Sequence, residues 1–199
     1  ALWYYYDECR FAYTDAQMSK VFIKTDDQNQ IKVEKVSRNS AQERKMVTLI
    51  KQLGLVETVA KRWERANSQD PFETFYTLLD AKDRLSSAKI SLELPEWEGK
   101  RLYAGEFSIE ELHAKLNQDW FDLNLVIIVG DEEIPFKSLL QHIKNGNRFY
   151  ALQSGEVFII PITWFEQYEQ LAAQCDLAGA LPKLAKSRFS VLEPLGIKP

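Results

Sequence analysis

Acidic side chains stand at both ends of one apolar stretch, which raises the question of metal-assisted hydrolysis. The groups available for such chemistry are Asp119, Asp122, Asp131, Glu132, Glu133 and Lys137. A metal-dependent nuclease or phosphatase needs two or more carboxylates on one divalent ion, with a Lys or His nearby to balance charge. The two aspartates and the acidic triplet lie about eight residues apart along a predicted strand, roughly 27 Å at about 3.4 Å per residue. They cannot share an ion within one chain, so a metal-dependent hydrolase is only a remote alternative, and a solvated hairpin turn explains the triplet.

Other catalytic and nucleotide-binding motifs are missing from the sequence. His113 and His142 are its only histidines, and their spacing matches no metal-ligand motif. There is no G-x-S-x-G, and Cys9 falls within a predicted strand. There is no G-x-G-x-x-G, and the only Gly-Lys pair, at 99–100, is followed by Arg instead of the Ser or Thr of a Walker A motif. We therefore assign no catalytic, cofactor-binding or metal-binding residue.

The composition is that of an ordinary globular segment. The chain has 199 residues, 45% of them hydrophobic, which suffices for one core or for two small cores side by side. Its 25 Lys and Arg against 29 Asp and Glu give a net charge of -4, which weighs against tight nucleic-acid binding by overall charge.

No apolar run approaches the roughly 20 residues of a membrane span, and no signal peptide is evident. Cys9 and Cys175 form no C-x-x-C and are expected to be buried thiols in a reducing compartment. We expect a cytoplasmic protein and, because the chain begins without Met, a piece of a longer one.

Short β-rich segments and two helices are predicted for the first half. Aromatic and β-branched residues predict strands in an antiparallel meander within residues 2–13, 20–24 and 31–36. An amphipathic helix of about four turns should follow, capped by Asn39 or Ser40 and ended by Gly54. After a connection at 56–69 with one short strand or turn of helix, a helix over 70–85 should have Asp70 as N-cap and Pro71 at its first position. A strand at 88–95 should end at Pro95.

The second half alternates strands and helices. Residues 108–116 suit a helix or a strand by spacing alone. From Trp120 to Val129 the odd-numbered residues share one face and the even-numbered residues the other, which predicts a strand half exposed at its start and buried on both faces at its end. After a turn at Gly130 and the acids, Pro135 restarts the chain. We then expect a helix at 136–144, a hairpin at 148–160 that turns at Gly155, a helix that starts at Pro161, and a short strand and short helix in the tail.

These elements indicate an α+β fold of antiparallel sheets and hairpins with flanking helices, in two small subdomains. The first subdomain, residues 1–95, would hold the meander and two helices. The second, residues 106–199, would hold the sequence DWFD and the hairpin RFYALQSGEVFII. The boundary should lie near residues 95–105, in a loop with two glycines.

Two mixtures of aromatic and basic residues suit a platform for single-stranded nucleic acid, on which bases stack while cations follow the backbone. The first is Trp3 to Tyr6 with Arg10 and Phe11, and the second is Arg148, Phe149 and Tyr150. The alternative is that alternate rings of each strand enter a core and leave the others for a neighbouring domain to cover.

The second half resembles the region just upstream of the motor in bacterial Swi/Snf-type helicase-like ATPases. The resemblance extends over residues 70–195 and includes the tail LAKSRFSVLEPL. The matching residues are Asp119, Trp120, Phe121, Asp122, Gly130, Gly146, Tyr150, Leu152, Gly155, Pro161 and Trp164. Ile162 and Thr163 depart from the family, in which acids are commoner there. The resemblance favours a strand at 111–116, paired with 120–129.

The resemblance implies a parent protein that hydrolyses ATP with Mg2+ and translocates on duplex DNA or remodels a nucleoprotein complex. The parent's Walker A, D-E-x-H and arginine-finger motifs are absent here, so no catalytic residue and no cofactor is carried over to this chain. Our leading hypothesis is a non-catalytic accessory module that docks the motor lobes or a protein partner. The candidate interaction surface comprises Trp3, Tyr5, Arg10, Trp120, Asp122, Arg148 and Tyr150. The alternative is direct nucleic-acid contact through Arg10, Lys100, Arg101 and Arg148 with neighbouring aromatics.

Overall fold

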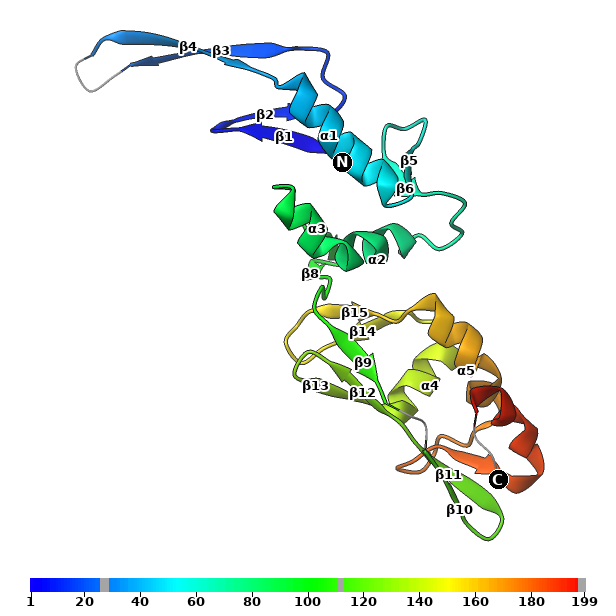
Figure 1. Cartoon of the computed structure of the whole chain (residues 1–199). Helices are drawn as coiled ribbons and strands as arrows, with labels where there is room; N and C mark the ends of the chain where they lie inside the picture. Colours follow the sequence, from blue (N-terminus) through cyan, green and yellow to red (C-terminus); the bar gives the residue numbers. More distant parts are fainter. Residues whose placement is uncertain (26–28, 111–112, 197–199) are drawn as a thin grey trace. The chain divides into compact units, whose positions relative to one another are not determined.

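The chain has an α+β fold and divides into two compact units, each described by itself below. The computed structural model describes residues 1–25, 29–110 and 113–196 (Figure 1). Unit 1 is Ala1–Leu92, and unit 2 begins at Glu93. None of the helices in the described residues is long and apolar enough to cross a membrane.

Within the described residues of unit 1, the strands form three separate antiparallel hairpins. They are β1 (Trp3–Tyr6) with β2 (Cys9–Ala12), β3 (Ser19–Thr25) with β4 (Ile31–Ser37), and β5 (Leu55–Glu57) with β6 (Trp63–Arg65). The predicted meander is therefore wrong. The first aromatic segment turns back on itself at Asp7, whose φ of 50° is unusual outside glycine, so β1 pairs with β2 and leaves β3 to pair with β4. The connection at 56–69 contains more regular structure than expected.

Helix α1 (Ser40–Gln52) confirms the predicted amphipathic helix and its end signals. The side chain of Asn39 accepts a hydrogen bond from the backbone N–H of Gln42 at 3.1 Å, which satisfies one of the donors left free at a helix start. Gly54 lies just past the end with φ of 78°, a conformation that glycine adopts without strain.

The single helix predicted over 70–85 is two helices, α2 (Glu73–Asp80) and α3 (Lys82–Ser87). The Asp70 carboxylate does not cap α2. It accepts from the backbone N–H of Phe72 at 2.9 Å and closes a local turn, which delays the helix start. The chain leaves helical geometry at Ala81, whose φ is -91° and ψ is 6°.

The strand predicted at 88–95 is absent, because none of these residues lies in a strand. The backbone N–H of Ile90 donates to the carbonyl of Leu85 at 2.9 Å, so the segment first closes the end of α3. Ile90 and Leu92 pack against the small cluster of unit 1 formed by Ile50, Leu53, Leu55, Ala81 and Leu85. These two alternate apolar residues therefore pack on the cluster, and the segment pairs with no strand in the described residues.

In the part of unit 2 that the structure describes, the strands form two three-stranded antiparallel sheets and two smaller hairpins. One sheet has the order β10 (His113–Leu116), β11 (Trp120–Asn124), β16 (Lys183–Ala185), and the other the order β13 (Glu132–Pro135), β12 (Val126–Val129), β9 (Phe107–Ile109). The hairpins are β7 (Glu96–Trp97) with β8 (Lys100–Arg101), and β14 (Phe149–Ala151) with β15 (Val157–Ile159). The hairpin at 148–160 was predicted, and Gly155 has the expected positive φ of 87°.

The ambiguous segment 108–116 supplies two strands in its described part. The pairing of β10 with β11 agrees with the strand that the resemblance favoured, although Glu111 and Leu112 lie outside the described residues. The predicted strand from Trp120 is divided into β11 and β12, which belong to different sheets. Glu132 and Glu133 belong to β13, and Pro135 is its last residue, so only Asp131 of the acidic triplet lies in the turn with Gly130.

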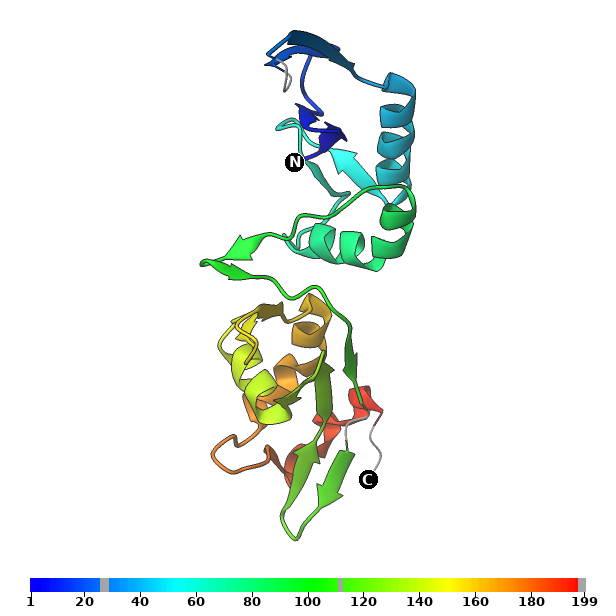
Figure 2. The same ribbon diagram turned by 90° about the vertical axis from the view of Figure 1, so that its left-hand side faces the viewer.

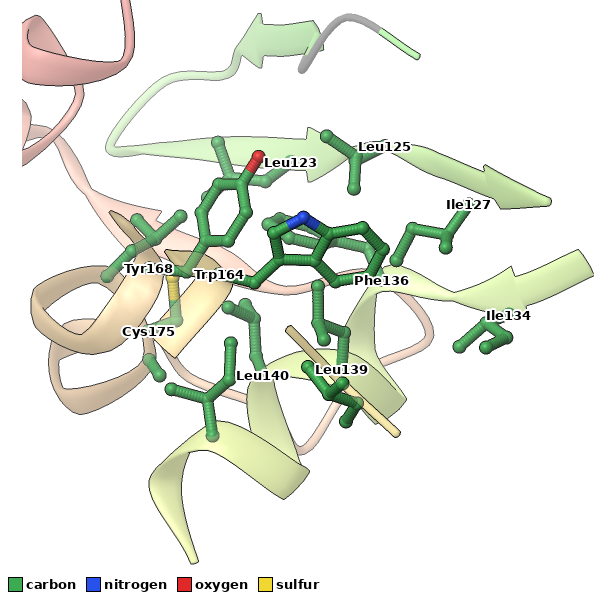
Figure 3. Packing of buried hydrophobic residues seen from close by; sticks show 14 of the residues in the cluster. Leu123, Leu125, Ile127, Ile134, Phe136, Leu139, Leu140, Trp164, Tyr168 and Cys175 are labelled. Carbon is green, nitrogen blue, oxygen red and sulfur yellow. The ribbon is translucent and has the colours of Figure 1, made fainter. Parts of the chain in front are cut away.

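Helix α4 (Phe136–Lys144) matches the predicted range, and α5 (Ile162–Gln174) begins one residue after Pro161, where the prediction placed its start. The tail forms β16 and the short 3-10 helices η1 (Lys186–Val191) and η2 (Glu193–Leu195). Helices α4 and α5 contact each other, and side chains of β11 and β12 point toward them in Figure 3, where Leu123, Leu125 and Ile127 face Trp164. These side chains form one large hydrophobic cluster.

Burial along β11 and β12 follows the predicted alternation on one face only. Phe121, Leu123, Leu125, Ile127 and Val129 are all buried. The opposite face stays open to the end, because Ile128 is 37% exposed, so the expected burial on both faces is wrong. The open face of β11 is polar at the start of that strand, where DWFD lies.

Candidate interaction site around Trp120

The sequence DWFD spans the turn into β11 and the first residues of that strand. Phe121 and Leu123 enter the core, with exposed fractions of 5% and 0%. Trp120 and Asp122 lie on the opposite face, and Trp120 is 36% exposed. The turn between β10 and β11 projects from unit 2 in two perpendicular views (Figure 1 and Figure 2), and DWFD begins in this turn.

Asp122 is the polar centre of this site. One carboxylate oxygen accepts from the indole N–H of Trp120 at 3.1 Å, and the other accepts from the side-chain amide of Asn117 at 2.5 Å. The backbone N–H of Asn117 also donates to the carbonyl of Trp120 at 2.8 Å and closes the turn between β10 and β11. Two hydrogen bonds thus orient the carboxylate, and the carboxylate orients the indole.

A cation contacts the indole ring itself. The Lys183 ammonium lies 4.9 Å from the centre of the Trp120 ring, within the range of a cation–π interaction. Lys183 comes from β16, where it stands directly across from Asp122, and Lys115 on β10 stands across from Asp122 on the other side. Trp120 is therefore held at its N–H and over its ring although a third of it remains in contact with solvent.

Asp119 anchors the same turn through its backbone. Its carbonyl accepts from the backbone N–H of Lys186 at 3.0 Å, so the turn is tied to the segment that follows β16. In DWFD, Phe121 therefore packs in the core, and Trp120 and Asp122 form an exposed polar and aromatic face.

The other predicted surface residues lie elsewhere. Trp3, Tyr5 and Arg10 share the exposed face of the β1–β2 hairpin in unit 1, where the Arg10 guanidinium lies 4.8 Å from the Trp3 ring centre. Arg148 and Tyr150 belong to the β14 region of unit 2. The Arg148 Nε donates to the carbonyl of Ile160 at 3.0 Å. Tyr150 is half-buried beside His142, and burial, with a smaller contribution from Glu132, raises the pKa of its phenol.

Three of the groups considered for metal chemistry bind different partners in the fold. Glu132 accepts from the backbone N–H of Gln153 at 2.7 Å, and Lys137 donates to the carbonyl of Gly179 at 2.9 Å, whereas Asp122 is occupied by Trp120 and Asn117. Across residues 1–25, 29–110 and 113–196, no group of three or more His, Cys, Asp or Glu side chains is placed to hold a metal ion. Both cysteines are free and buried, and burial raises the pKa of the Cys175 thiol to about 12.

Sequence reasoning missed several residues near exposed aromatics. Asn117 and Lys183 contact the DWFD residues, but Lys183 lies far along the chain and carries no local signal of this contact. The rings of Trp97 and Phe149 stack with their centres 4.2 Å apart and their planes 12° apart. Trp97 was assigned to a loop, so this stack between β7 and β14 was not predicted.

Comparison with known proteins adds no relative to this description. Models of protein families, curated proteins and solved structures were all searched, and none matches the chain.

Proposed function

We propose that this chain is a non-catalytic docking module of a bacterial Swi/Snf-type DNA-dependent ATPase, and that the Trp120 site is the surface on which the motor or a protein partner docks. The observation that carries the proposal is an exposed tryptophan fixed at its N–H by Asp122 and over its ring by Lys183. A fixed aromatic side chain loses little conformational entropy on binding, and tryptophan is enriched among residues that dominate interface energies.

The positions of the family-like residues support the same proposal. Gly130, Gly146 and Gly155 each have positive φ and lie at turns, and Trp164 is buried in the large cluster. These residues therefore belong to one folded unit, in which Trp120 is the aromatic member left exposed. ATP and Mg2+ would act in the parent's cytoplasmic motor lobes, and DNA would be engaged through the parent.

The first test concerns the family. The coding sequence that continues beyond residue 199 is expected to specify a Walker A lysine followed by D-E-x-H. A continuation that lacks both motifs would remove the family assignment and leave the surface to be tested alone.

The second test concerns docking. The whole chain is titrated with the separately expressed motor lobes of the same reading frame by isothermal calorimetry. Trp120→Ala should weaken binding about tenfold or more, the loss typical of a dominant interface residue. Asp122→Ala, which leaves the ring but removes the acceptor of its N–H, should cause a smaller loss.

Trp97→Ala is the matched control, because Trp97 is 41% exposed in the same unit and distant in sequence from DWFD. It should bind the lobes as the wild type does, and circular dichroism checks that each variant is folded. Equal affinity of the wild type and Trp120→Ala would refute docking at this site.

A second candidate function, contact with single-stranded nucleic acid, is favoured by the Trp97–Phe149 stack. Lys100 lies directly across from Trp97 in the β7–β8 hairpin, Arg101 is the next residue, and Arg148 precedes Phe149. Bases stack on exposed rings while such cations neutralise phosphates. Arg10 belongs to unit 1, so the cations named for this function do not all come from one unit.

Fluorescence anisotropy with a labelled oligothymidylate tests this candidate. Binding should weaken as salt rises, and Trp97→Ala and Arg101→Ala should reduce it, whereas Trp120→Ala should not. Absence of binding at low salt would eliminate the candidate without affecting the docking proposal.

A further inference from the structure

The β3–β4 hairpin of unit 1 carries an apolar face that the proposed function does not use. The two strands pair over seven residues each, and Ile23 stands directly across from Val33. Val21, Ile23, Ile31 and Val33 point to one side with exposed fractions of 60%, 73%, 74% and 65%. A contiguous set of β-branched aliphatic side chains this exposed is typical of an interaction surface.

The opposite face of the hairpin is anchored to unit 1. The Lys20 ammonium donates to the carbonyl of Arg10 at 2.7 Å and lies 4.6 Å from the Phe11 ring centre. Lys24 pairs with Glu8 at 2.9 Å and with Glu34 at 3.3 Å. The β1–β2 hairpin therefore contacts one face, and the aliphatic face is directed away from it.

The edges of the hairpin are also open. Neither β3 nor β4 pairs with a third strand in the described part of the chain. An isolated two-stranded ribbon is marginally stable in water, and three or more strands with a hydrophobic face are more stable, so a third strand at the edge would stabilise this hairpin. An extended segment that joins such an edge gains main-chain hydrogen bonds and places alternate side chains on each face.

Charge distinguishes the two edges. On β3, Lys20 and Lys24 are occupied by Arg10, Glu8 and Glu34. On β4, Lys32 and Lys35 are exposed and make no hydrogen bond or ion pair with the described residues. The open cations therefore lie on β4, beside Ile31 and Val33.

We propose that the outer edge of β4 accepts a strand from another protein, in which aliphatic residues face Ile31 and Val33 and carboxylates face Lys32 and Lys35. A partner of this chemistry places apolar side chains beside Ile31 and Val33 and neutralises the two lysines. A second copy of the chain would instead bring a second set of the same uncompensated lysines, and aliphatic side chains offer nucleic acid no stacking surface. The proposal is independent of docking at Trp120, which lies in the other unit.

The test uses the whole 15N-labelled chain and two short peptides. The first, acetyl-Thr-Glu-Thr-Val-Glu-Val-Thr-amide, places its glutamates opposite Lys35 and Lys32 and its valines opposite Val33 and Ile31 when it pairs antiparallel. The second has lysine in place of both glutamates. Titration should shift the amide signals of residues 31–37, with about tenfold tighter binding of the acidic peptide, because opposite charges across strands attract and like charges repel.

Charge reversal supplies the decisive comparison. Lys35→Glu should weaken binding of the acidic peptide and strengthen that of the basic one. Lys82→Glu, at an exposed lysine of α3 in the same unit, is the matched control and should leave both affinities unchanged.

Four results would overturn the proposal. No shift within residues 31–37 with either peptide shows that the edge does not accept a strand, and equal affinity for both peptides shows that its cations do not select carboxylates. Sedimentation that reveals self-association lost on Lys35→Glu identifies a second copy as the occupant. Shifts of β4 on addition of phosphatidylglycerol vesicles, without a response to the acidic peptide, identify a lipid surface.

Discussion

Unit 2 buries a continuous set of aliphatic and aromatic side chains from its strands and from helices α4 and α5, whereas unit 1 buries a small apolar cluster and an ion pair. Arg38 contacts Glu43 at 2.8 Å, and their side chains are only 7% and 10% exposed. Unit 1 is therefore held together by a few directional polar contacts, whereas unit 2 is held together by many apolar contacts that have no preferred direction.

The polar network of unit 1 joins three of its elements. Arg38 follows β4, donates to Glu43 of α1 and also donates to the carbonyl of Asp15 at 2.5 Å. The Tyr6 hydroxyl of β1 donates to Glu43 at 2.6 Å and accepts from the backbone N–H of Asn39 at 2.7 Å. Loss of Glu43 would therefore remove the acceptor that Arg38 and Tyr6 share.

The largest expected effect that tests this comparison is that of Glu43→Ala. It should lower the free energy of unfolding of unit 1 by about 3–5 kcal/mol, because Arg38 is left buried without its counter-ion. Hydrogen exchange during urea unfolding measures the loss unit by unit. Leu123→Ala is the counterpart in unit 2, where it should leave a cavity that costs about 2–5 kcal/mol.

Glu73→Ala is the matched control for Glu43→Ala. Glu73 pairs with Arg65 at 3.3 Å, but both side chains are well exposed, so the expected cost is at most about 1 kcal/mol. Similar losses from Glu43→Ala and Glu73→Ala would show that the buried network does not hold unit 1 together.

Acid should also produce a difference in stability between the two units, but a smaller one than these substitutions produce. Burial alone would raise the pKa of Glu43, but hydrogen bonds from Arg38 and Tyr6 and the charge of Arg38 outweigh it and lower that pKa. A lowered folded-state pKa gives stability that is present above the ordinary glutamate value of about 4.3 and lost as pH falls through the folded value. Unit 1 should therefore lose stability below about pH 5.

Urea unfolding of unit 1 between neutral and acidic pH measures this dependence. In Glu43→Gln the acid-induced loss should be smaller, because position 43 no longer binds a proton; an unchanged slope would assign the loss to other groups. Alkali acts on both units, since burial raises the pKa of Tyr4 in unit 1 and of Cys175 in unit 2 to about 12. The stability that depends on Cys175 begins to be lost above the ordinary Cys value of about 8.5, and that of Tyr4 above the ordinary Tyr value of about 10.

The sequence predicted elements whose signals are local. Asn39 and Gly54 bracket α1, Pro161 precedes α5, and Gly155 turns the hairpin, because each residue acts through its own backbone or nearest neighbours. Strand pairing depends on partners distant in sequence, so the meander and the strand at 88–95 were predicted wrongly. Alternation favours an extended segment but does not identify what will pair with it.

The candidate site divides in the same way. The alternation along β11 placed Trp120 and Asp122 on one face, as the pattern of burial shows. The contacts that fix the indole required the third strand, because Lys183 reaches Trp120 only after β16 pairs with β11. No spacing within the sequence encodes that pairing.

The smallest expected effects concern helix starts, where the units again differ. Helix α1 is capped by the Asn39 side chain, whereas α5 follows Pro161 without a side-chain cap. Asn39→Ala should cost unit 1 about 1 kcal/mol, because the N–H of Gln42 loses its acceptor. Pro161→Ala should cost unit 2 about 0.4–1 kcal/mol, because the unfolded chain gains conformational freedom.

These losses are close in size but differ in origin. Asn39→Ser retains a capping oxygen and should restore most of the stability of unit 1, whereas the loss at Pro161 involves no side-chain acceptor that a substitution could restore. Urea unfolding of all three variants separates the two causes, and failure of Asn39→Ser to recover stability would show that the cap contributes through Asn39's backbone conformation instead of its hydrogen bond.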